Sequence, residues 1–171
     1  LFRSQNIPER TLQPRVSGIT MMMDKGMSTR EMEDFLSTSS NYTDLIKFGF
    51  GTALISKNVR EKVSLIKQAG IKPYLGGTTF ELFYARDRIK DYFQLVDNLD
   101  IETIEISDGS IFINHDEKCH LINEYSKNYQ VLSEVGSKEE GILISPAKWI
   151  KMMANELQAG SWKVIAEGRE S

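Results

Sequence analysis

Two acidic residues mark the end of one short apolar segment, TIEISDGSI, at residues 103–111. Its first residues have the composition of a buried β-strand, yet Glu105 lies within the strand and Asp108 in the turn that follows. Burying an ionised carboxylate without a partner costs several kcal/mol at least. We therefore expect a compensating group beside Glu105, and the candidates are a metal cation, a lysine and a proton of a substrate.

Charged residues also recur at or just after the ends of the other predicted strands, and they carry both signs. They are Asp24, Lys47, Glu134, Lys138, Lys163, Glu167 and Arg169. In a chain with two histidines and one cysteine, carboxylates favour a hard cation such as Mg²⁺ over zinc. A salt-bridge network that only fills the interior is the alternative for any one residue. Several ion pairs at one edge favour a functional site, because buried ion pairs are weak stabilisers.

These residue types suit a reaction that forms an enolate or its phosphate ester. A metal would neutralise the developing negative charge, and a lysine of lowered pKa would exchange the proton on carbon. Lysine and arginine would hold phosphate or carboxylate groups of a substrate. Glycine-rich loops at 49–51 and at Gly76 and Gly77 have amides that could approach an anion, although ordinary tight turns explain these loops equally well.

The elements that must position these residues alternate along the chain. Short apolar segments are followed by amphipathic segments with helix-capping residues, which is typical of β/α units in a parallel sheet. We predict strands at 16–24, 42–49, 72–77, 103–107, 130–135 and 162–167. Predicted helix starts are a capping box of Ser28 with Glu31, a second of Thr78 with Glu81, and Ser145 before Pro146.

Side chains alternate along each strand between a helix-facing side and an inner side. In the strand at 103–107, this assigns Ile104 and Ile106 to the helices and Glu105 to the inside. The same reasoning groups Lys47 with Leu45, Glu134 with Leu132, and Lys163 with Ile165, Glu167 and Arg169. In a barrel, catalysis occurs at the carboxyl ends of the strands, where these charges would converge.

Six β/α units account for the 171 residues, whereas a (β/α)₈ barrel usually needs about 250 residues. We therefore predict one α/β domain over residues 1–171, either about six units of a barrel or an open parallel sheet. No G-x-G-x-x-G follows the first strand, so dinucleotide binding is not favoured. The ends resemble cuts in a longer chain, and two open sheet edges would predict aggregation or a homo-oligomer.

Composition excludes several classes of protein. A net charge of -3 without a basic stripe disfavours a nucleic-acid partner. No apolar segment approaches the roughly 18 residues of a membrane span, and the first residues lack a signal-peptide core, so we expect a cytoplasmic protein. We expect His115 and His120 to cap or line the surface of a helix. The apolar stripe of the last helix should join the core: Trp149, Met152, Met153 and Leu157.

Six segments, in this order and at this spacing, closely resemble the phosphosulfolactate synthase family: PRVSGITMMMDKG, DLIKFGFGT, GGTTFE, IEISDGSI, LSEVGSK and AGSWKVIAEGRES. The similarity covers nearly the whole chain. It implies a (β/α)₈ barrel and the Mg²⁺-dependent addition of sulfite to phosphoenolpyruvate, which yields (2R)-phospho-3-sulfolactate for coenzyme M synthesis. The metal would bind the carboxylate and phosphate-ester end of the substrate, and a lysine would protonate the resulting aci-carboxylate.

The resemblance also implies roles for individual residues. The implied metal ligands are Glu105, Asp108 and Glu134, with Glu167 as a further ligand or the partner of a cation. The implied general acid is Lys138, and the implied anion-binding residues are Lys47, Lys163 and Arg169. The family loop usually reads EVGKK where this chain has EVGSK, and EARES where it has EGRES. The first difference leaves the position of the proton donor open.

Two alternatives remain open. A lyase or aldolase on the same frame would use Lys47 or Lys163 as a Schiff-base amine and would need no metal. Plant relatives of the family are associated with heat-stress tolerance, so a non-enzymatic role in binding or protecting other proteins is the second alternative.

Overall fold

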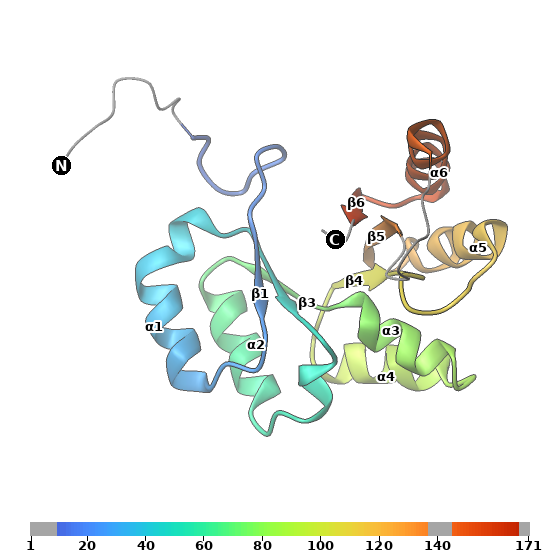
Figure 1. Cartoon of the computed structure of the whole chain (residues 1–171). Coiled ribbons are helices and arrows are strands. Elements are labelled where there is room, and N and C mark those ends of the chain that lie inside the picture. The colour runs from blue at the N-terminus through green and yellow to red at the C-terminus, as the bar shows by residue number, and fades with distance from the viewer. Residues whose placement is uncertain (1–9, 137–144, 168–171) are drawn as a thin grey trace.

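The computed structural model describes residues 10–136 and 145–167 of the chain (Figure 1). Six parallel strands form one sheet in the order β1-β2-β3-β4-β5-β6. The strands are β1 (Met21–Asp24), β2 (Leu45–Phe48), β3 (Lys72–Leu75), β4 (Thr103–Ile106), β5 (Gln130–Gly136) and β6 (Lys163–Glu167). A doubly wound sheet reverses its strand order, whereas a barrel adds each strand beside the last. The consecutive order therefore confirms six units of the barrel type.

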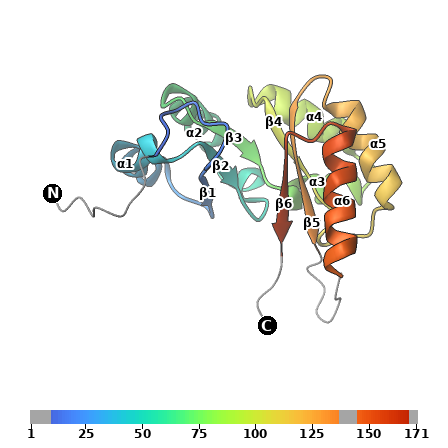
Figure 2. The ribbon, with the colours of Figure 1, turned by 90° about the horizontal axis from the view of Figure 1, so that it is seen from above.

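Helices follow the strands in alternation, and two of them, α3 and α4, lie between β3 and β4. The helices are α1 (Thr29–Ser39), α2 (Val59–Gln68), α3 (Gly77–Tyr84), α4 (Ile89–Asn98), α5 (His115–Tyr125) and α6 (Pro146–Ala159). Short 3₁₀ segments are η1 (Ser40–Tyr42) and η2 (Thr52–Leu54). Seen from above, α1 and α2 lie beside the first strands and α4, α5 and α6 beside the last (Figure 2). The strands thus form a half-barrel with its helices.

The main core lies between the sheet and the helices. Alternate strand residues such as Ile46, Phe48 and Ile104 are fully buried there and pack against apolar helix residues. A smaller apolar cluster of Leu45, Tyr74 and Leu132 lies on the other face of the sheet. The predicted alternation is therefore confirmed, and it places two distinct environments on the two faces of each strand.

Helix starts follow the predicted caps at two of three positions. Ser28 and Glu31 form the capping box, with the Ser28 hydroxyl accepting from the Glu31 amide at 3.2 Å. Ser145 caps α6 ahead of Pro146. The capping box predicted for Thr78 and Glu81 is wrong, because the N-cap of α3 is Gly76, two residues before Thr78, and makes no side-chain hydrogen bond.

The predicted apolar stripe of α6 is only partly core. Trp149, Met152 and Met153 are half-buried, whereas Leu157 is 49% exposed. The fully buried side chain of this helix is instead Glu156, which faces α5 and forms an ion pair there. A charged residue thus occupies the position that periodicity alone gives to an apolar one.

Across the part of the chain that the structure describes, no helix has the length and apolar character needed to cross a membrane.

Candidate functional site

Three charged residues from three different strands meet on the inner face of the sheet. The Lys47 Nζ lies 2.8 Å from Glu105 Oε1 and 3.6 Å from Glu134 Oε2. All three side chains are buried, and Glu105 is fully so. Lys47 on β2, Glu105 on β4 and Glu134 on β5 were each assigned to the inside by alternation, and this placement is confirmed. A lysine, one of the candidates for compensating Glu105, is therefore its partner.

Burial dominates the electrostatics of Glu105. It raises the pKa of this carboxyl, while the ammonium of Lys47 acts in the opposite direction and the charge of Glu134 raises the pKa further. The Gly77 amide donates to Glu105 Oε1 at 2.7 Å. The second oxygen, Oε2, is buried and has no hydrogen-bond donor among the residues described. Glu105 thus has one satisfied oxygen and one available to a further cation or donor.

Two glycines allow this close packing. A Cβ at Gly76 would lie 2.7 Å from Lys47 Cε, and a Cβ at Gly77 would lie 2.7 Å from Glu105 Oε1. Both positions therefore need glycine for steric reasons. The anion that the Gly77 amide contacts is Glu105 itself, so this amide already has a partner within the protein.

Tyr74 also belongs to the inner cluster, although it was not predicted as a site residue from the sequence. It pairs in register with Lys47 and is fully buried. Burial raises the pKa of its hydroxyl strongly, and the carboxylates of Glu105 and Glu134 raise it further, so the phenol stays protonated. Alternation along KPYLGG was the available signal, because it assigns Tyr74 to the inner face.

Asp108, predicted as a metal ligand, contacts a different group. Its Oδ1 lies 2.7 Å from the Nζ of Lys118 on α5, which in turn lies 2.9 Å from Glu156 Oε1 on α6. Lys118 also donates to the main-chain oxygen of Glu134. Asp108 therefore belongs to an ion-pair network with residues of α5 and α6, because it pairs with the fully buried Lys118.

Two other residues of the turn between β4 and α5 form hydrogen bonds with Glu81 of α3. Ser107 and the Gly109 amide both donate to Glu81 Oε1, the latter at 2.9 Å. Alternation along β4 would place Ser107 on the same side as Glu105, but its hydroxyl contacts a helix. His115 was expected to be a surface or capping residue, but its Nδ1 is buried and lies 3.8 Å from Glu156 Oε1.

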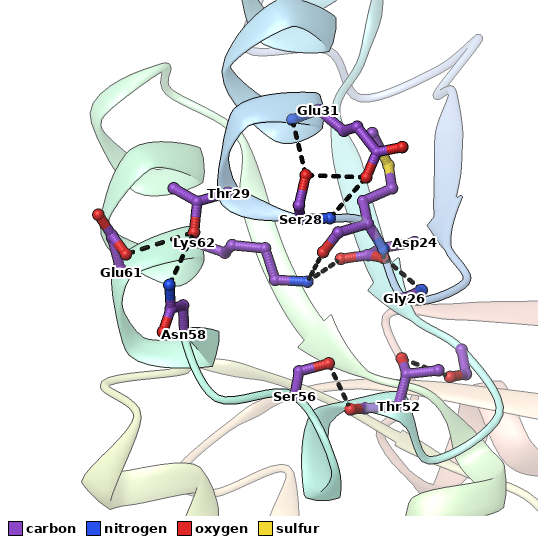
Figure 3. Close-up of polar contacts among 12 residues, drawn as sticks. Asp24, Gly26, Ser28, Thr29, Glu31, Thr52, Ser56, Asn58, Glu61 and Lys62 are labelled. Atoms are coloured by element: carbon purple, nitrogen blue, oxygen red, sulfur yellow. Dashed lines mark hydrogen bonds and ion pairs between the residues drawn. The ribbon is translucent and has the colours of Figure 1, made fainter.

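Asp24 also faces the helices rather than the barrel. It pairs in register with Phe48, a core residue, and its Oδ2 lies 2.6 Å from the Nζ of Lys62 on α2 (Figure 3). Neither Lys62 nor Lys118 was predicted as a buried charge from the sequence. Lys62 lies four residues before Ile66, and Lys118 four residues before Ile122, so each lysine is in the apolar stripe of its helix. A lysine within an apolar stripe was the available sign of a buried charge.

The remaining predicted site residues are not gathered with Glu105. Lys163 is the first residue of β6 rather than the last, and its ammonium lies 5.6 Å from the ring centroid of Trp162, so its predicted place at the carboxyl end is wrong. Glu167 ends β6 and pairs in register with Gly136. Lys138 and Arg169 lie outside the described residues.

The inner cluster offers two carboxylates to a cation. Within residues 10–136 and 145–167, no group of three or more histidine, cysteine, aspartate or glutamate side chains is placed to hold a metal ion. Mg²⁺ commonly takes only one or two protein carboxylates and completes its octahedron with water and substrate oxygens. Glu105 and Glu134 therefore fit Mg²⁺ by ligand type, and the unsatisfied Glu105 Oε2 is consistent with such a ligand.

Residues 8–171 match the family described as (2R)-phospho-3-sulfolactate synthase. The chain is 41% identical over 169 residues to the phosphosulfolactate synthase of Methanothermobacter thermautotrophicus, covering 96% of this chain and 66% of the relative. It is 35% identical over 170 residues to the phosphosulfolactate synthase of Bacillus subtilis, covering 98% of this chain and 68% of the relative. It is 38% identical over 159 residues to the phosphosulfolactate synthase of Methanocaldococcus jannaschii, covering 90% of this chain and 63% of the relative. The chain thus spans about two thirds of the length of these curated relatives.

Proposed function

The chain belongs to the phosphosulfolactate synthase family, and from this premise we propose that its barrel site catalyses the addition of sulfite to phosphoenolpyruvate, forming (2R)-phospho-3-sulfolactate. The observation that carries the proposal is the buried Lys47 between the carboxylates of Glu105 and Glu134. Apolar side chains of similar volume would stabilise the interior at least as well as an ion pair. A functional role explains why charges occupy this position.

The proposed reaction forms a carbon–sulfur bond and then a carbon–hydrogen bond. The sulfur lone pair of sulfite attacks the methylene carbon of phosphoenolpyruvate, and the electrons of the double bond move onto the substrate carboxylate. The aci-carboxylate that results is protonated at the carbon bearing the phosphate ester. Lys138 is our candidate for the proton donor, and it lies outside the described residues.

The residues of the inner cluster would bind and orient the substrate. Lys47 balances the two glutamates and offers N–H donors to an anionic group that enters the cluster. Gly77 fixes one oxygen of Glu105, so the other oxygen keeps a defined direction. Tyr74 remains a neutral phenol close enough to feel the charge of both carboxylates. Together these contacts would hold the reacting group away from bulk water.

We further propose that Glu105 and Glu134 bind Mg²⁺. When bound, the ion would supply positive charge against the negative charge that develops on the substrate carboxylate. A Schiff base on Lys47 is less favoured, since it needs a free neutral amine, whereas this nitrogen is engaged by two carboxylates. A cytoplasmic location and a homo-oligomeric state stay predictions.

The test is ³¹P NMR of phosphoenolpyruvate incubated with the protein, sulfite and Mg²⁺. We expect protein-dependent conversion to phosphosulfolactate that stops when EDTA is added. Conversion that persists in EDTA would reject the metal but keep the reaction. Trapping of a carbonyl substrate on Lys47 by borohydride, without any conversion of phosphoenolpyruvate, would replace the proposal with Schiff-base chemistry.

A further inference from the structure

A buried ion pair fixes the loop that follows β1. Asp24 Oδ2 and Lys62 Nζ are 2.6 Å apart, and neither side chain is more than 1% exposed. The other carboxylate oxygen, Oδ1, accepts from the amides of Gly26 and Met27 at 2.7 and 2.6 Å (Figure 3). Lys62 also donates to the Met27 carbonyl at 2.8 Å. Asp24 therefore holds two amides of the loop, and Lys62 holds one of its carbonyls.

The ammonium of Lys62 is buried and makes its contacts within the protein. It contacts Asp24 and the Met27 carbonyl, and it lies 5.1 Å from the ring centroid of Phe48. A fully satisfied buried network is rigid, and removing one member leaves the others unpaired. Lys62 is thus suited to hold the loop in place and not to react.

The loop carries Lys25 at the carboxyl end of β1. Met23 pairs in register with Lys47 and so lies on the inner side of β1, whereas Asp24 pairs with Phe48 and faces the helices. Lys25 follows Asp24 directly and lies in the bend beyond the carboxyl end of the strand. Its ammonium lies 5.7 Å from the ring centroid of Phe50, which follows β2 at the same end of the sheet.

Lys25 is exposed, and no carboxylate of the described residues lies within salt-bridge distance of it. Lys47 is buried in the inner cluster, where it pairs with two glutamates, whereas Lys163 lies at the opposite end of its strand. Phe50 has a φ of 53°, a left-handed conformation that is uncommon for a non-glycine residue. Among the residues that the structure describes, Lys25 is therefore an exposed cation at this rim without a carboxylate partner.

We propose that Lys25 binds an anionic group of the substrate at the mouth of the barrel, and that Asp24 and Lys62 are positioning residues that hold it there. The anion-binding role expected of Lys163 thus passes to Lys25. The inference rests on the proposed function for the identity of the substrate. The chemical class, an oxyanion with more than one negative charge, includes both the phosphate ester of phosphoenolpyruvate and sulfite.

The first experiment compares Lys25→Gln with Lys163→Gln, which removes the same charge from the other end of a strand. The KM values for phosphoenolpyruvate and for sulfite are measured separately. We expect Lys25→Gln to raise one of them by about 10- to 100-fold, as for loss of a charge-assisted hydrogen bond, with a smaller change in kcat. The substrate whose KM rises is the one that Lys25 holds. Equal KM values for both variants would overturn the proposal.

The second experiment does not need turnover. Acetylation of Lys25 by acetic anhydride is followed by mass spectrometry with and without phosphoenolpyruvate or sulfite. Protection of Lys25 by either ligand, with Lys163 unprotected, supports the inference even if the protein converts no substrate, in which case only the proposed reaction fails. Turnover by the wild type without protection of Lys25 overturns the inference alone.

The positioning role is tested through the loop amides. Lys62→Met should speed hydrogen exchange at Gly26 and Met27 and raise the same KM as Lys25→Gln, whereas Lys25→Gln should leave that exchange unchanged. Asp24→Asn, which keeps an acceptor for the amides, serves as a milder variant if Lys62→Met does not fold. Faster exchange with unaltered KM would show that the pair is purely structural.

Discussion

The two ends of the half-barrel use the same arrangement of charges in opposite environments. At the inner site, Lys47 lies between Glu105 and Glu134, and all three are buried. At the amino ends of the strands, Lys67 lies between Asp100 and Glu102, 2.6 and 3.2 Å away, and these two carboxylates are more than 80% exposed. The geometry is similar, so the difference in solvent access decides what each group contributes.

Helix α2 carries the same contrast along its own length. Lys62, near its start, forms a 2.6 Å ion pair with Asp24 that is shielded from water, whereas Lys67, near its end, forms a 2.6 Å pair with Asp100 in solvent. Water screens the second pair but not the first. Distance alone is therefore a poor guide to the strength of an ion pair, and burial with complete hydrogen bonding is the better one.

Activity should separate the two lysine clusters most sharply. We expect Lys47→Met to lower kcat/KM for the proposed reaction by at least about 100-fold, because a buried electrostatic contact to the reacting group is lost. Lys67→Met should keep nearly wild-type activity. The measurement is conversion of phosphoenolpyruvate by ³¹P NMR. Similar losses in both variants would mean that the inner cluster has no special role.

Stability should separate the two ends of α2. Lys62→Met leaves Asp24 buried without its cation and should lower the free energy of unfolding by about 3–5 kcal/mol. Lys67→Met should cost at most about 1 kcal/mol. Urea denaturation followed by circular dichroism measures both. A loss below about 1 kcal/mol for Lys62→Met would contradict the importance that we give to burial.

Salt should affect only the exposed pair. At about 1 M NaCl the screening length falls to about 3 Å, so the small penalty of Lys67→Met should vanish. The penalty of Lys62→Met should persist, because its ion pair is out of contact with solvent. The comparison needs only the denaturation midpoints of the three proteins at low and high salt. Disappearance of both penalties would show that solvent reaches the buried pair.

A smaller effect concerns Tyr129 at the amino end, whose hydroxyl donates to Asp97 at 2.6 Å. Burial, followed by this hydrogen bond, raises the pKa of Tyr129 to about 12. The raised pKa means that the contact stabilises the protein below about pH 10, the value for an unfolded tyrosine, and that this contribution is lost as the pH rises through 12.

Phenolate absorbance measures that titration. The pKa of Tyr84 is also raised to about 12, so Tyr129→Phe should reduce the step near pH 12, and Asp97→Asn should shift the Tyr129 part of it to lower pH. If Asp97→Asn left the Tyr129 step unchanged, the hydrogen bond to Asp97 would not contribute to the raised pKa of Tyr129.

Local periodicity was enough to predict much of the site. The period of two along the strands placed Glu105, Lys47 and Glu134 on the inner face, and the structure brings them together. Capping residues located the starts of α1 and α6. The same period would have found Tyr74 had it been applied to β3.

Other features depend on contacts between distant segments. Asp108 was predicted beside Glu105 because both lie at one strand end, yet Lys118 of the next helix holds it elsewhere. Asp24 likewise contacts Lys62, which is 38 residues away in the sequence. No local pattern specifies which lysine on a helix will be buried, because that depends on the helix or loop that packs against it.

The sequence by itself therefore determined the β/α alternation, the strands and the inward direction of their charges, since each follows from the geometry of a few neighbouring residues. The tertiary structure alone decided which charges become partners and which are removed from water. The reason is physical: pairing energy depends on burial and on distances across the fold, and neither quantity is defined until the strands and helices have packed together.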